Sequence, residues 1–151
     1  MHSFLTQIDL PNEAATLALG AAVAAHMEIG DTLALRGDLG AGKTTLARGL
    51  IGALSGEGDV PSPTYTLVQT YETPKGELWH GDMYRLEQPQ DCIELGLEDA
   101  FLDCICVIEW PDKLGGFLPD TAVNITIIFD GAGRVARIEG AKQWIKDLSL
   151  T

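Results

Sequence analysis

The sequence predicts an α/β fold in which a mostly parallel central sheet carries antiparallel hairpins at its edges. Strand-like and helix-like patterns alternate along much of the chain. The run at residues 104–108 is apolar throughout and ends at a carboxylate, Glu109, as expected for a strand buried on both faces. Two pairs of β-prone runs flank tight turns and predict the hairpins. With 151 residues, 46% of them hydrophobic, the chain is expected to form one domain over residues 1–151.

The beginning of the chain predicts a strand followed by a helix. Residues 4–8 are β-prone, and Asn12 is suited to cap the helix that comes next. That helix is rich in alanine, and its expected apolar stripe includes Leu17, Ala21 and Ala25.

The second half of the chain predicts two hairpins separated by short helices. A turn at residues 74–76 joins two β-prone runs, and residues 88–102 show the broken helical spacing of one or two short helices. Strands are expected over residues 122–129 and 134–139, on either side of a glycine-containing turn. A short helix is expected to close the chain.

The charge argues against direct, tight binding to nucleic acid. Ten Lys and Arg residues face twenty-two Asp and Glu residues, which gives a formal net charge of −12. Since cationic side chains supply most non-specific affinity for phosphate backbones, any action on RNA is expected to pass through a partner protein. The sequence has no apolar run long enough to span a membrane, and its start lacks the features of a signal peptide. A cytoplasmic protein is therefore expected.

Three cysteines, Cys92, Cys104 and Cys106, are predicted to be buried reduced thiols. The alternative of a metal site is weaker, because zinc needs about four ligands and the sequence shows no second Cys/His cluster.

A glycine-rich loop carries the strongest functional signal. Residues 32–36 predict a strand, and residues 37–44 then match the phosphate-loop pattern G-x-x-x-x-G-K-[ST] at every fixed position. Backbone N–H groups of such a loop bind phosphate, Lys43 can reach the terminal phosphates, and Thr44 offers a hydroxyl to Mg²⁺. A glycine turn that carries Lys-Thr by chance is the alternative. The following helix has its apolar stripe at Leu46, Leu50 and Ile51.

Two carboxylates could complete a magnesium site. Glu109 ends the buried strand, where P-loop proteins place an acid near the metal, although a solvated acid is the alternative. Asp82 is a second candidate, which spacing alone does not separate from an ordinary turn residue. No lysine lies in an Asn/Thr-Lys-x-Asp guanine motif, so adenine is preferred by default.

Four signatures in chain order resemble the TsaE (YjeE) family of small bacterial P-loop ATPases, which take part in making threonylcarbamoyladenosine in tRNA. They are GDLGAGKTT at residues 37–45, SPTYTLV at 62–68, H-x-D-x-Y-R at 80–85 and EWP at 109–111. A weaker fifth is the Gly-Arg pair at 133–134.

The resemblance implies a P-loop NTPase-like three-layer fold and a set of site residues. The catalytic residues would be Lys43, Asp82 and Glu109, and the metal ligands Thr44, Glu109 and Asp82. The residues expected to bind ATP are Asp38, Leu39, Gly40, Ala41, Gly42, Lys43, Thr44, Thr45, Thr64, Trp110 and Arg134. Among them, Thr64 would sense the γ-phosphate, Trp110 would pack beside the nucleotide or serve as a core aromatic, and Arg134 would lie near the base or ribose.

The resemblance also implies a reaction and partners. The chain would be an Mg²⁺-dependent ATPase that acts with the TsaD and TsaB proteins and meets tRNA only through them. Intrinsic turnover would be slow, because only one of the five arginines, Arg85, lies in a signature and no arginine finger is evident. A small-molecule P-loop kinase and a nucleotide-gated interaction module that does not hydrolyse remain as alternatives.

Overall fold

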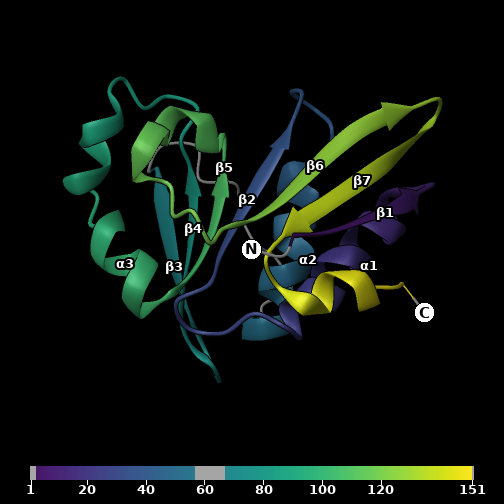
Figure 1. Cartoon of the computed structure of the whole chain (residues 1–151), viewed down its shortest axis with the longest axis horizontal. Helices are drawn as coiled ribbons and strands as arrows, with labels where there is room; N and C mark the ends of the chain where they lie inside the picture. Colours follow the sequence, from purple (N-terminus) through teal and green to yellow (C-terminus); the bar gives the residue numbers. More distant parts are fainter. Residues whose placement is uncertain (1–2, 57–66, 151) are drawn as a thin grey trace.

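The framework of the protein is a seven-stranded sheet in the order β1-β7-β6-β2-β5-β4-β3, seen in a computed structural model that describes residues 3–56 and 67–150 (Figure 1). Strands β6, β2, β5 and β4 are parallel, and β1, β7 and β3 join by antiparallel pairing at the two edges. The predicted fold class is confirmed. The strands are β1 (Phe4–Leu10), β2 (Thr32–Gly37), β3 (Val68–Thr73), β4 (Gly76–Asp82), β5 (Ile105–Glu109), β6 (Val123–Asp130) and β7 (Gly133–Gly140).

Helices cover the two faces of this sheet. Figure 1 shows α1 and α2 side by side, and α3 at the opposite side of the molecule. The α-helices are α1 (Glu13–Ala24), α2 (Lys43–Ser55) and α3 (Leu97–Asp103), and the 3-10 helices are η1 (Pro89–Ile93), η2 (Pro111–Phe117) and η3 (Gln143–Asp147). Both predicted hairpins are present, whereas η2 was not predicted, because Pro111 reads as a break. Over the described ranges, no helix has the length and apolar character needed to cross a bilayer.

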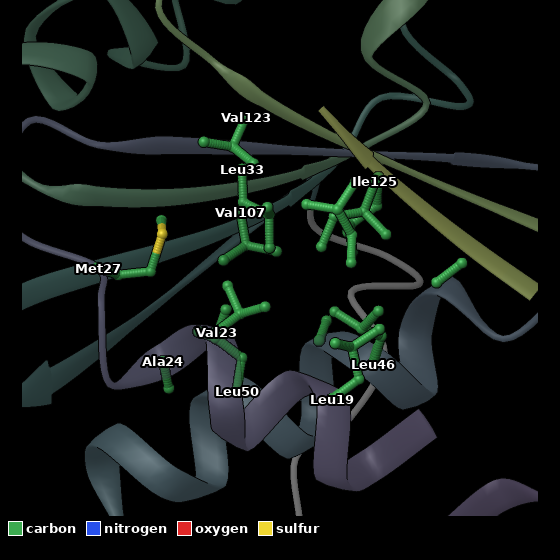
Figure 2. Packing of buried hydrophobic residues seen from close by; sticks show 14 of the residues in the cluster. Leu19, Val23, Ala24, Met27, Leu33, Leu46, Leu50, Val107, Val123 and Ile125 are labelled. Carbon is green, nitrogen blue, oxygen red and sulfur yellow. The ribbon is translucent and has the colours of Figure 1, made fainter. Parts of the chain in front are cut away.

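The larger core lies between the sheet and the pair α1 and α2. In Figure 2, side chains of both helices, such as Leu19 and Leu46, point toward Leu33, Val107 and Ile125 of the sheet. Each fully buried side chain of this size contributes roughly 1.5–3 kcal/mol to folding. This packing fixes α2 against β2, and so fixes the two ends of the loop that joins them.

A smaller core covers the other face of β4 and β5. Cys106 and Ile108 of β5 pack there with Cys92 of η1 and Phe101 of α3. All five residues of β5 are buried, as the apolar run predicted. The three cysteines are free and buried, which confirms that prediction, and burial raises the pKa of the Cys106 thiol to about 12.

Helix α1 begins as predicted but buries a different face. Asn12 caps it, since the N–H of Ala15 donates to Asn12 Oδ1 at 2.9 Å. The predicted stripe of Leu17, Ala21 and Ala25 is wrong, because both alanines are exposed and Leu17 is half-buried. The helix is apolar on every side, so spacing alone could not locate its buried face. The buried residues are Thr16, Leu19, Gly20, Val23 and Ala24.

Two glycines let α1 and α2 approach backbone to backbone. A Cβ atom on Gly20 would lie 2.2 Å from the carbonyl oxygen of Leu46, and one on Gly49 would lie 2.3 Å from that of Leu17. Real Cβ atoms do not approach backbone so closely, and therefore no larger residue fits at either position. The close contact holds the beginning of α2, and with it the loop that precedes α2, at a fixed place.

We expect Gly49→Ala to lower the free energy of unfolding by about 2–4 kcal/mol, because the added methyl group would push the helices apart. This would occur although alanine favours a helix over glycine by about 1 kcal/mol. Urea unfolding would measure it. Gly116→Ala is the control, since a Cβ there meets nothing within 4 Å. Equal stability of the two variants would contradict the backbone contact.

Candidate functional site

The glycine loop joins the carboxyl end of β2 to the first turn of α2. Gly37, Gly40 and Gly42 have φ angles of 144°, 83° and 112°, which side chains other than glycine rarely adopt. The N–H of Ala41 donates to the carbonyl oxygen of Asp38 at 3.0 Å and closes the turn. Successive N–H groups in such a turn, ahead of a helix N-terminus, form a site for anions.

Lys43 lies folded over the loop in this structure. Its side chain is buried, and its Nζ donates to the carbonyl oxygens of Gly37 and, at 3.3 Å, Asp38. The same ammonium lies 3.8 Å from the centroid of the Trp110 ring. Burial lowers the pKa of Lys43, and the nearby charge of Glu109 opposes this shift. The Lys43 side chain is thus held against the loop that precedes it.

Glu109 is a buried acid with both carboxylate oxygens engaged. It is 2% exposed, and its Oε1 accepts a hydrogen bond from Thr44 Oγ1 at 2.9 Å. Its Oε2 lies 2.7 Å from Nε2 of His80, which is fully buried. The alternative of a solvated acid at the strand end is therefore wrong.

His80 is a buried partner of Glu109 that sequence reasoning left without a role. It lies on the same face of β4 as Leu78. Because side chains alternate between the two faces of a strand, a core residue is expected at this position. A polar residue at such a position, two before Asp82, is the signal that could have found it.

Asp82 lies beside Glu109, because the two residues are partners in the β4–β5 register. Its Oδ1 accepts a hydrogen bond from the N–H of Tyr84 at 3.0 Å, so it also shapes the turn. Burial raises the pKa of Asp82, and the charge of Glu109 adds to that shift. The structure therefore brings together both predicted carboxylates. They share a cavity of about 320 Å³ lined by Leu39, Gly40, Gly42, Lys43, Thr44, Thr45, Asp82, Glu109 and Trp110.

Trp110 forms one wall of this cavity. Its ring contacts the Lys43 ammonium, and the centroid of the Tyr84 ring lies 5.0 Å from its own centroid. It also packs against the smaller core, so its alternative role as a core aromatic is confirmed. With φ of 56°, Trp110 is the one residue other than glycine with positive φ in the described part of the chain.

Arg134 lies on the other side of the loop. Its Nε donates to the carbonyl oxygen of Ala41 at 3.2 Å, and its guanidinium lies 4.2 Å from the centroid of the Phe129 ring. A second cavity, of about 240 Å³, opens there between the start of α1, the loop and the β6–β7 turn. The two cavities share Gly40, Gly42 and Thr45, so they flank the loop.

Two predicted residues do not join these cavities. Asp38 lines neither of them, and its contribution to the loop is its backbone carbonyl. Thr64 lies outside the described residues, as does the rest of its signature except Leu67 and Val68.

The loop between a parallel strand and a helix, with Lys43 and Thr44 at the helix start, places the chain among the P-loop nucleotide-binding proteins. The family model described as Threonylcarbamoyl adenosine biosynthesis protein TsaE matches residues 10–136. The chain belongs to the TsaE family.

Individual proteins of this family are similar to the chain over most of its length. The tRNA threonylcarbamoyladenosine biosynthesis protein TsaE of Haemophilus influenzae is 42% identical over 115 residues, covering 75% of this chain and 73% of the relative. The protein of that name in Rickettsia bellii is 35% identical over 140 residues, covering 91% of this chain and 97% of the relative. A crystal structure of Bacillus subtilis YdiB matches with a TM-score of 0.76 at 26% identity, covering 97% of this chain and 93% of that one.

We expect Asp82→Asn to raise the melting temperature of the ligand-free protein at neutral pH by about 1–3 °C. Because burial raises the folded-state pKa of Asp82, its ionised form destabilises the fold at neutral pH. The penalty disappears as pH falls below the unfolded-state value, so the two melting temperatures should converge in acid. Thermal unfolding between pH 4 and pH 8 measures this, with the exposed Asp120→Asn as control. A lower melting temperature for Asp82→Asn at neutral pH would refute the expectation.

Proposed function

We propose that this chain is an Mg²⁺-dependent ATPase, in one domain over residues 1–151, that acts in the formation of threonylcarbamoyladenosine in tRNA. One observation carries the proposal: Lys43, Thr44, Asp82 and Glu109 converge on a single cavity beside the phosphate loop. Membership of the TsaE family supports the assignment to this modification.

The two cavities suggest how ATP lies on the loop. Its phosphates would follow the shared residues Gly40, Gly42 and Thr45, with the γ-phosphate toward Lys43. The nucleoside would then enter the cavity of about 240 Å³, where Arg134 offers a planar cation for ribose or base. This orientation leaves the carboxylates at the reacting end.

The residues present fit a magnesium ion. Thr44, Asp82 and Glu109 offer oxygen ligands, which Mg²⁺ prefers. Across the described residues, no group of three or more His, Cys, Asp and Glu side chains could hold a metal alone, so phosphate oxygens would have to complete its coordination. Once bound, the ion would neutralise charge on the β- and γ-phosphates. Glu109 is buried and Asp82 is its partner in the strand register, so the two carboxylates offer oxygen ligands at one place.

The chemistry would be phosphoryl transfer to water. The bond from the γ-phosphorus to the β,γ-bridging oxygen breaks as a water oxygen bonds to that phosphorus. Lys43 and the loop amides stabilise charge on the departing oxygens. Asp82 is suited to orient the water, because its Oδ1 is engaged by Tyr84 and no described residue engages its Oδ2. Both oxygens of Glu109 already contact protein groups, so Glu109 is better suited to hold the metal beside Thr44 than to orient the water.

A partner would complete this site. None of the five arginines, all within the described residues, lines the cavity with the carboxylates. The chain therefore lacks its own arginine finger there, and slow hydrolysis alone is expected. The TsaB and TsaD proteins are the proposed partners, and the net charge of −12 is consistent with tRNA contacts made by them. The cytoplasm is the proposed location.

We expect phosphate release from Mg²⁺-ATP, without any acceptor, to be slow for the chain alone and at least tenfold faster with TsaB and TsaD. Lys43→Ala and Glu109→Gln should each lower the stimulated rate by about 10²–10³, the usual loss of a charge-stabilising group. Lys113→Ala, at an exposed lysine, should not change it.

Other outcomes would favour the competing functions. Fast hydrolysis alone with no effect of partners would count against the proposal. Phosphate transfer seen only with a small acceptor would indicate a kinase. A Glu109→Gln variant that binds ATP, hydrolyses none and still supports tRNA modification would indicate a nucleotide-gated module.

We expect Arg134→Ala to weaken ATP binding about tenfold, or ~1.4 kcal/mol, while the affinity for inorganic tripolyphosphate changes little. The reason is that Arg134 lines the proposed nucleoside cavity and not the cavity with the carboxylates. Calorimetric titration measures both ligands, with exposed Arg137→Ala of the same strand as control. Equal losses of affinity for both ligands would instead indicate that Arg134 supports the phosphate loop through its hydrogen bond to Ala41.

A further inference from the structure

His80 is buried completely at a place where the fold offers no structural need for a polar group. It projects from β4 onto the face of the sheet that α2 covers, between Leu78 and Asp82 in the alternation of that strand. The buried polar residues that the structure describes are Thr16, Thr32, Lys43, His80 and Glu109. The last three lie together in the nucleotide site, although burying polar groups opposes folding.

The two ring nitrogens of His80 have different surroundings. Nε2 lies 2.7 Å from Oε2 of Glu109, and Nδ1 is buried with no hydrogen-bond partner. A ring that carries its proton on Nε2 donates to the carboxylate and leaves Nδ1 as an acceptor, which tolerates the lack of a partner better than a buried N–H would. The ring is thus arranged to donate one hydrogen bond, and its acceptor is Glu109.

Glu109 in turn connects three elements of the fold. His80 of β4 holds Oε2, and Thr44 of α2 donates to Oε1 at 2.9 Å. The carboxylate lies at the end of a flexible side chain whose last torsion is broad, so one hydrogen bond to Thr44 would leave its plane free to turn. One contact to each carboxylate oxygen defines that plane.

We propose that His80 is a positioning residue, which holds the Glu109 carboxylate in the orientation that presets Thr44 and Glu109 for a magnesium ion. The inference rests on the proposed function, because it assigns a role within the same ATP site. It goes beyond that function in making metal use depend on a residue that touches neither metal nor nucleotide. Conserved-volume replacements can test it.

The test compares His80→Leu, which fills a similar volume without a donor, with His80→Gln, whose amide can still donate to Glu109. Calorimetry would measure the Kd of ATP in EDTA and in Mg²⁺, and steady-state assays with the TsaB and TsaD proteins would measure kcat and KM. Thr32→Val is the matched control, since it removes a buried polar group outside the site.

We expect His80→Leu to bind ATP in EDTA within twofold of the wild-type chain but to lose most of the strengthening by Mg²⁺. The Mg²⁺ concentration for half-maximal hydrolysis should rise about tenfold, and kcat should fall about tenfold with KM within twofold. His80→Gln should restore both to within threefold. Thr32→Val should leave Mg²⁺ dependence unchanged.

Three results would overturn the role of His80. They are normal Mg²⁺ dependence in His80→Leu, equal losses in EDTA and Mg²⁺, and a folded His80→Gln that behaves like His80→Leu. If His80→Leu does not fold, His80→Asn replaces it, because its shorter amide cannot reach Glu109. A wild-type chain whose ATP binding ignores Mg²⁺ would instead overturn the proposed function, so the two failures can be told apart.

Discussion

The carboxylate of Glu109, buried at the end of a central strand, is the constraint on which the site depends. An ionised acid in an apolar interior needs partners from several directions, and the order of the strands supplies them. Because β5 lies between β2 and β4, the end of β5 is adjacent both to the phosphate loop and to His80 and Asp82. The close contact of α1 with α2 holds α2 in place, and Thr44 in its first turn donates a hydrogen bond to Glu109. The fold therefore places hydrogen-bonding partners from two other elements around this buried carboxylate.

The side chains of the site are engaged by one another and by the loop. Loop carbonyls and the Trp110 ring surround the Lys43 ammonium, and Glu109 accepts a hydrogen bond from the Thr44 hydroxyl. ATP and a cation would have to exchange these contacts for their own. The net free energy of binding would accordingly be smaller than the number of new contacts suggests. The side chains would need little rearrangement, however, because they already line one cavity.

The parts of the fold that could be predicted from sequence were those with local causes. A continuous apolar run identified β5, glycines identified the turns, and the fixed spacing of the loop identified Lys43 and Thr44. Glu109 was a candidate from its place at the end of the buried strand, but Asp82 was separated from a turn residue only through resemblance, because the proximity of the two carboxylates comes from the register between β4 and β5. His80 was missed for the same reason. The buried face of α1 could not be predicted, because this helix carries apolar residues on every side. Its packing against α2, close at Gly49, decides which face is buried.

The backbone conformation of Trp110 affects both the stability of the protein and the shape of its site. A left-handed conformation in a residue with a large side chain, directly before Pro111, carries a strain of order 1–2 kcal/mol. Glycine or asparagine at this corner would relieve the strain but would lose the packing of the indole against the smaller core, so neither replacement is expected to raise the melting temperature. Such replacements would remove the aromatic wall from beside Lys43. Core packing on one side of the indole thus offsets the strain of its own backbone, and the same ring forms the wall beside Lys43, so stability and the shape of the site depend together on one side chain.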